Sequence, residues 1–64
     1  IAINKYNSEY INLSTADSWY ARGLSLYAMK RYQDSINSFD KAIALKPNFP
    51  DAIKARNIAQ KQLQ

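Results

Sequence analysis

The chain has 64 residues with no cysteine and no histidine, and nine Lys and Arg against five Asp and Glu give a formal net charge of +4. The missing cysteine and histidine exclude a disulfide framework and the usual metal clusters, while one glycine and two prolines argue against a disordered chain and a turn-rich β fold. A chain this short buries only about 60% of its unfolded surface, so its stability must come from helix packing or from neighbouring units.

The first segment, residues 1–13, has helical periodicity. Ile3, Tyr6 and Tyr10 follow the spacing i, i+3, i+7. The asparagines between them lower helix propensity, and the segment is short. We therefore expect a helix that needs a partner helix.

A second helix is predicted from Ala16 to about residue 29 or 30. Ser14 or Thr15 can cap its free N–H groups, and Asp17 in the first turn suits the helix dipole. Two apolar stripes indicate packing on both sides, or one side left free for a ligand. One stripe holds Trp19, Gly23 and Leu26, and the other holds Tyr20, Leu24 and Tyr27.

Gly23 stands in the middle of this helix, where glycine costs about 1 kcal/mol relative to alanine. Nothing local explains that cost. We expect another helix to approach so closely that a Cβ would clash, with Ser35 as the small residue opposite.

A short turn at Lys30–Tyr32 and a third helix from about Gln33 to Leu45 follow. The turn contains neither glycine nor proline, so we expect a short connection between antiparallel helices. Pro47 ends the third helix. Its predicted apolar face holds Ile36, Phe39 and Ile43, with Ala42 beside them.

A fourth helix is predicted from Pro50 through Leu63. Pro50 fits the first helical turn, and Asp51 follows in a favourable position. The helix has one apolar face and is otherwise polar, which suits a final helix with one face in solvent.

An internal repeat links these elements. Ile3-Asn4-x-Tyr6 recurs as Ile36-Asn37-x-Phe39, a period of 33 residues. The first and third helices are then equivalent, as are the second and fourth.

The stretch 16–49 resembles a tetratricopeptide repeat, a helix–turn–helix unit of 34 residues. Leu26 stands where the family usually has Tyr, and Arg22 where it usually has Leu. The residues at family positions are Trp19, Gly23, Phe39, Ala42 and Pro47, with Ser35 at a small-residue position.

The resemblance implies an all-α fold of antiparallel helix–turn–helix repeats, stacked as an α-solenoid fragment of about four helices. Single hairpins of this kind stack because one alone cannot bury its faces. Residues 1–13 would be the second helix of a preceding repeat, 16–49 a full repeat, and 50–64 a C-terminal capping helix that ends a longer array.

The resemblance also implies a concave groove for a peptide or partner protein. Tyrosines are favoured interface anchors, and lysines in the groove could hold a carboxylate. The alternative is that this stripe simply packs on neighbouring helices. The implied groove residues are Asp17, Tyr20, Leu24, Tyr27 and Ala28, with Lys54, Ile58 and Lys61 from the fourth helix, where Asp51 shares their face.

Some family members grip a C-terminal carboxylate with Lys and Asn at fixed groove positions. Those positions hold Tyr20 and Leu24 here, so such a clamp is not supported.

Catalysis and cofactor binding have no support in the residues. Histidine and cysteine are absent, no general base lies in a recognisable arrangement with a serine, and no glycine-rich phosphate loop exists. We therefore expect no enzyme, no metal and no cofactor.

Other partner classes are also disfavoured. Only Lys30 and Arg31 are adjacent among the scattered basic residues, whereas a nucleic-acid interface would cluster them. No run of about 18 apolar residues could span a membrane. The lack of cysteine is compatible with a reducing compartment, which favours a cytoplasmic location without establishing it.

Two functions remain open. The first is a protein–protein interaction scaffold that binds a peptide or partner protein through the groove. The second is a structural self-assembly module, in which repeats of different chains stack to form a homo-oligomer. The sequence does not identify the partner.

Overall fold

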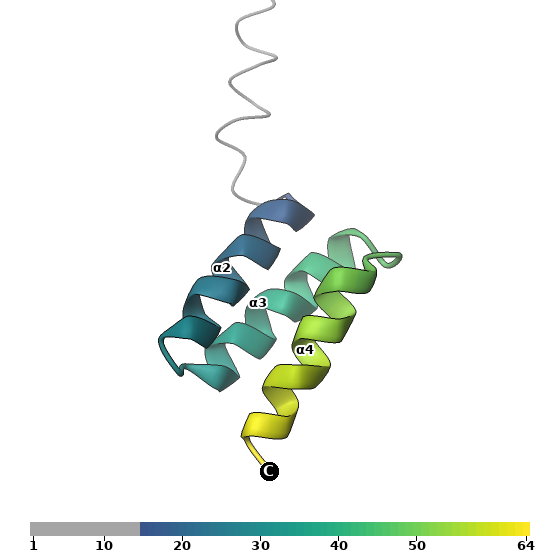
Figure 1. The fold of residues 1–64 in the computed structure, drawn as a ribbon. Helices are drawn as coiled ribbons and strands as arrows, with labels where there is room; N and C mark the ends of the chain where they lie inside the picture. Colours follow the sequence, from purple (N-terminus) through teal and green to yellow (C-terminus); the bar gives the residue numbers. More distant parts are fainter. Residues whose placement is uncertain (1–14) are drawn as a thin grey trace, which may run out of the picture.

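The computed structural model describes residues 15–64, in which all regular secondary structure is helical. The described helices are α2 (Ala16–Ala28), α3 (Tyr32–Leu45) and α4 (Pro50–Gln62) (Figure 1). The predicted helix over residues 1–13, and with it the count of about four helices, lies outside the described residues. The predicted turn was one residue too long, because Tyr32 already belongs to α3.

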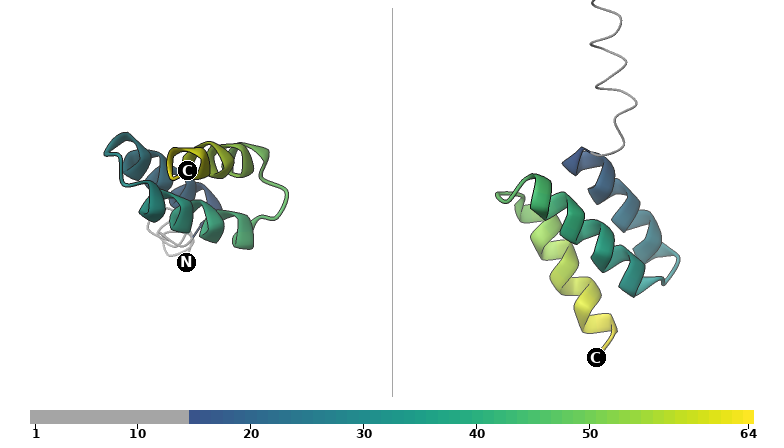
Figure 2. Two further views of the ribbon diagram at one scale, coloured as in Figure 1. Left: turned by 90° about the horizontal axis from the view of Figure 1, so that it is seen from below. Right: turned by 180° about the vertical axis from the view of Figure 1, so that it is seen from behind.

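The helices form an antiparallel arrangement with α3 as the common neighbour. Helices α2 and α4 run in roughly the same direction, and α3 runs against both (Figure 1). Seen end-on, α3 lies on one side of the molecule and α4 on the other (Figure 2). α3 packs extensively on both neighbours, whereas α2 and α4 touch over a much smaller area. A helical hairpin followed by a third packed helix is thus the architecture of the described part.

Thr15 caps the start of α2. Its Oγ1 accepts a hydrogen bond from the backbone N–H of Ser18 at 3.2 Å and donates one to the Ser18 Oγ at 2.8 Å. The side-chain oxygen thereby satisfies one of the N–H groups that the first helical turn leaves free. Of the two predicted caps, Thr15 is the one described.

The end of α2 is a Schellman motif with a lysine in the place that glycine usually takes. The N–H of Arg31 donates to the carbonyl of Leu26, and the N–H of Lys30 donates to that of Tyr27, both at 2.9 Å. Lys30 has a φ of 63°, the left-handed conformation that this motif requires after the helix. The chain reverses direction here, and the left-handed conformation of Lys30 costs free energy because its Cβ lies close to the following carbonyl oxygen.

The core is centred on α3. The predicted apolar face of this helix is confirmed for Ile36, Phe39 and Ala42, which are buried, whereas Ile43 is half-buried. The small residues Ala52 and Ala59 let α4 pack closely on this face. Two linked clusters result, one around Phe39 and Ala59 and the other around Ala42, Phe49 and Ala52.

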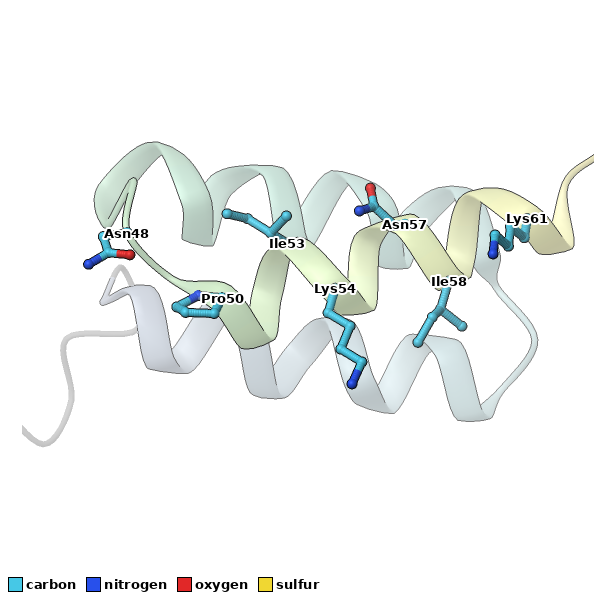
Figure 3. Close-up of a pocket in the computed structure, with 7 residues that line it drawn as sticks. All are labelled: Asn48, Pro50, Ile53, Lys54, Asn57, Ile58 and Lys61. Atoms are coloured by element: carbon cyan, nitrogen blue, oxygen red, sulfur yellow. The ribbon is translucent and has the colours of Figure 1, made fainter.

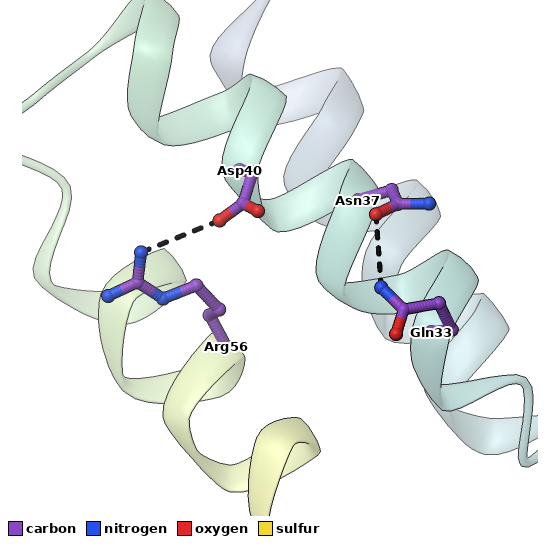
Figure 4. A network of polar contacts seen from close by, with 4 residues as sticks. All are labelled: Gln33, Asn37, Asp40 and Arg56. Carbon is purple, nitrogen blue, oxygen red and sulfur yellow. Dashed lines mark hydrogen bonds and ion pairs between the residues drawn. The ribbon is translucent and has the colours of Figure 1, made fainter. Parts of the chain in front are cut away.

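Polar contacts reinforce the outer surface of α3. A hydrogen bond joins Gln33 to Asn37 along the helix at 3.2 Å, and an ion pair of 3.5 Å joins Asp40 to Arg56 of α4 (Figure 4). Asp40 is exposed, so the ion pair contributes little to stability in water. Packing of apolar side chains therefore holds α4 on α3.

Gly23 is explained by the ring of Phe39. A Cβ placed on Gly23 would lie 2.6 Å from Cδ1 and 2.9 Å from Cζ of that ring, with Cε1 nearer still. The predicted close approach is confirmed, but the nearest atoms belong to Phe39 and not to Ser35. Ser35 is buried and donates a hydrogen bond to the carbonyl of Tyr32 at 2.7 Å.

We predict that Gly23→Ala destabilises the chain by about 1–3 kcal/mol, although alanine is the better helix former. The Phe39 ring is fully buried, and in a close-packed core a ring can move aside only by losing other contacts. Urea unfolding followed by circular dichroism measures the change.

A double-mutant cycle with Phe39→Leu provides the control. Leucine removes the ring atoms nearest the new methyl group, so the two changes together should cost less than the sum of their separate costs. Additive costs would contradict the proposed clash.

We predict that Lys30→Gly stabilises the chain by about 0.5–1 kcal/mol. Glycine removes the strain of the left-handed conformation, and the greater freedom of the unfolded chain offsets part of that gain. Thermal and urea unfolding measure it. Lys30→Ala is the matched control, because it removes the same charge but keeps the Cβ. Equal stabilisation by both variants would assign the effect to charge and contradict the strain.

Candidate functional site

A recess of about 560 Å³ runs along the outer surface of α4 (Figure 3). Aliphatic side chains form much of its lining, and the remaining polar groups are amides and lysine ammonium groups. An apolar recess with a few polar groups is the usual form of a binding site. The lining residues are Asn48, Pro50, Ile53, Lys54, Asn57, Ile58 and Lys61.

Helical spacing brings these side chains together. Lys54, Ile58 and Lys61 follow the spacing i, i+4, i+7, so they lie on one face of α4. Lys54 and Ile58 point towards α2, whereas Ile53 and Asn57 lie along the opposite edge of α4 (Figure 3). The recess follows the surface between these two rows.

Three of the residues expected in the groove from the sequence therefore line the recess, namely Lys54, Ile58 and Lys61. The expectation did not include Asn48, Pro50, Ile53 or Asn57. Ile53 was recognisable only as one of several apolar residues in an amphipathic helix. That pattern does not tell which apolar side chains stay uncovered in the folded chain.

Among the groove residues expected on α2, Leu24 is the one with a large apolar side chain that is exposed. Leu24 and Ile58 are each 43% exposed, and they stand 34 residues apart at equivalent positions of two helices that run in the same direction. Asp17 and Ala28 are also exposed. These side chains are accessible to a partner without any rearrangement of the helices.

Tyr20 belongs largely to the packing between helices. The centroid of its ring lies 5.9 Å from that of Phe39 and 5.1 Å from that of Phe49. Tilted aromatic pairs at such distances stabilise a core beyond their buried area. Tyr20 is half-buried, so only part of the side chain faces solvent.

Tyr27 is placed in a similar way. Its ring meets that of Tyr32 edge-on with the centroids 5.2 Å apart, and it packs against the cluster around Ile36 and Phe39. The sequence left open whether the stripe of tyrosines binds a ligand or packs on helices. In the structure both rings take part in packing, whereas Leu24 between them is exposed.

A second recess of about 360 Å³ lies beside Trp19, between α2 and α3. The guanidinium of Arg22 lies 5.4 Å and the ammonium of Lys41 5.1 Å from the centroid of the Trp19 ring, within the range of cation–π attraction. Arg22, which departs from the family pattern, is therefore an exposed residue that packs on Trp19. Arg31 and Asp34 form a 2.6 Å ion pair at the edge of this recess.

Residues 15–64 bring no three His, Cys, Asp or Glu side chains close enough to hold a metal ion. Among the same residues, no helix has the length and hydrophobicity needed to cross a membrane.

Comparison with known proteins identifies the family. No curated protein and no solved structure matched the chain. The model of the tetratricopeptide repeat family matches residues 16–49, which are 34 of the 64 residues and comprise α2, α3 and the loop before α4. Repeats of this family generally mediate protein–protein interaction and are typically not enzymes. The chain belongs to the tetratricopeptide repeat family.

Proposed function

We propose that the chain binds a peptide or a partner protein through the surface that α2 and α4 share. The observation that carries this proposal is the equal exposure of Leu24 and Ile58 at equivalent positions of the two helices. Because 43% of each residue is still exposed, burial of that remaining surface would contribute about 1 kcal/mol per residue to association. The recess beside Ile58 gives a partner side chain a place to insert.

The arrangement of the surface supports this proposal. Its core is apolar, and its edge carries the exposed groups Asp17, Lys54 and Lys61. Protein-binding surfaces commonly combine a central apolar patch with a polar rim. In the proposed groove Leu24 and Ile58 supply the apolar contacts, the lysines orient the partner, and Tyr20 and Tyr27 chiefly hold the surface in shape.

The same exposed side chains support a second candidate, self-assembly. Within residues 15–64, the large apolar residues that stay exposed are Leu24, Met29, Leu45, Ile58 and Leu63. Stacking of repeats from different chains would cover several of them, and the solenoid arrangement of the family would extend between chains. Association would then depend on protein concentration.

We predict that Leu24→Gln and Ile58→Gln each weaken binding of a peptide partner by about five- to tenfold, because each replaces an apolar contact of about 1 kcal/mol with a polar amide. Partners are obtained by selecting peptides from a random displayed library against the unmodified chain. Fluorescence anisotropy then measures the dissociation constants. Leu45→Gln is the matched control, because Leu45 is exposed at the end of α3 and does not line the recess.

Stability measurements separate binding from folding. Leu24→Gln and Ile58→Gln should change the free energy of unfolding only slightly, since both side chains are exposed. Tyr20→Ala should cost about 2 kcal/mol, less than the loss of a fully buried ring, because it removes a half-buried ring that packs on Phe39 and Phe49. Equal binding by the Leu45, Leu24 and Ile58 variants would contradict the proposed surface.

Sedimentation equilibrium over a range of concentrations distinguishes the two candidates. A monomer at every concentration leaves the surface open to a partner and excludes self-assembly. A dimer that dissociates in Ile58→Gln but not in Leu45→Gln would assign the surface to a second copy of the chain.

A further inference from the structure

The recess along α4 carries positive charge with no acidic residue in its lining. Its polar lining consists of the ammonium groups of Lys54 and Lys61 and the amides of Asn48 and Asn57. The amides are neutral and the two ammonium groups are positively charged, so the charge of the lining is wholly positive. Asp51 stands in the first turn of α4 but does not line the recess.

The ion pairs of the described chain leave both lysines out. The two pairs found in residues 15–64 join Arg31 to Asp34 and Asp40 to Arg56. Lys54 and Lys61 take part in neither. Their charges are therefore available to a partner that brings carboxylates.

The spacing of the two lysines describes the partner more closely. They stand seven residues apart on α4, which is two helical turns or about 10.5 Å. Ile58 lies between them on the same face. A second helix presents the complementary pattern when two carboxylates stand seven residues apart and an apolar side chain projects between them.

A second copy of the chain fits this recess poorly. Each chain carries a net charge of +4, so self-association would bring like charges together. In a symmetric contact along α4 the lysines of one copy would face those of the other. Like charges across an interface oppose association, whereas an acidic partner is attracted.

We propose that the α4 recess binds an acidic amphipathic helix of a partner protein. Apolar side chains of that helix pack on Ile53 and Ile58, and carboxylates two turns apart pair with Lys54 and Lys61. This inference rests on the proposed function, since it specifies the partner of the surface that α2 and α4 share.

The test uses the 64-residue chain and two synthetic helical peptides with blocked ends. One peptide has glutamates seven positions apart with two leucines midway between them, and the other has glutamine in place of both glutamates. We expect the glutamate peptide to bind about tenfold more tightly at low salt, and added salt to remove most of that difference.

Paired substitutions locate the effect. In Lys54→Gln/Lys61→Gln the preference for glutamate should disappear. In Lys30→Gln/Lys41→Gln, which removes the same charge outside the recess, the preference should persist. The inference would be overturned if the preference for the glutamate peptide survived in Lys54→Gln/Lys61→Gln, or if it fell equally in both variants.

Further outcomes keep the inference distinct from the proposed function. If both peptides bound equally well and Ile58→Gln abolished this binding, the proposal of an acidic partner would be wrong. The proposed binding surface would still be supported. The acidic partner is likewise overturned, and the surface kept, if neither peptide binds while library-selected peptides do. If no peptide of any kind binds at millimolar concentration, both proposals fail. Binding to anionic lipid vesicles that depends on Lys54 and Lys61, without binding to the glutamate peptide, would assign the charge to a membrane surface and overturn the inference.

Discussion

The contact between the Phe39 ring and the backbone of α2 at Gly23 fixes the geometry of the hairpin and of the helix packed on it. No side chain separates the ring from the helix there, so α2 and α3 approach as closely as backbone and ring allow. The ring also meets Tyr20, which meets Phe49 before α4. One aromatic side chain thus sets the distance within the hairpin and the position of the helix that follows it.

This aromatic core determines which side chains remain outside. Because α4 packs through the small residues Ala52 and Ala59, its larger aliphatic side chains stay outside the core, where Ile58 is exposed and Ile53 is half-buried in the lining of the recess. On α2 the tyrosines fill the space beside Phe39, and Leu24 between them stays exposed. The packing that stabilises the hairpin therefore also creates the apolar surface proposed for binding.

The basic residues of the described part also divide into those that form an ion pair or lie over an aromatic ring and those that do neither. Arg31 and Arg56 pair with aspartates of α3, and Arg22 and Lys41 lie over Trp19. These contacts engage basic residues on the surfaces of the α2–α3 hairpin and its junction with α4. Lys54 and Lys61 form no ion pair within residues 15–64, so unpaired positive charge and exposed aliphatic surface meet on the outer face of α4.

Local patterns in the sequence were enough to establish the helical class, the family and most helix ends. Apolar periodicity, the cap at Thr15 and the prolines at 47 and 50 act over a few residues, so their effects can be read locally. The position of Gly23 in the middle of a helix also predicted that another helix approaches closely there. The folded arrangement was needed to show that this neighbour is Phe39, that Lys30 adopts a left-handed conformation, and that Tyr20 and Tyr27 pack while Leu24 and Ile58 stay exposed. Those outcomes depend on how helices distant in sequence meet, because the same apolar stripe suits a core and a binding surface equally well.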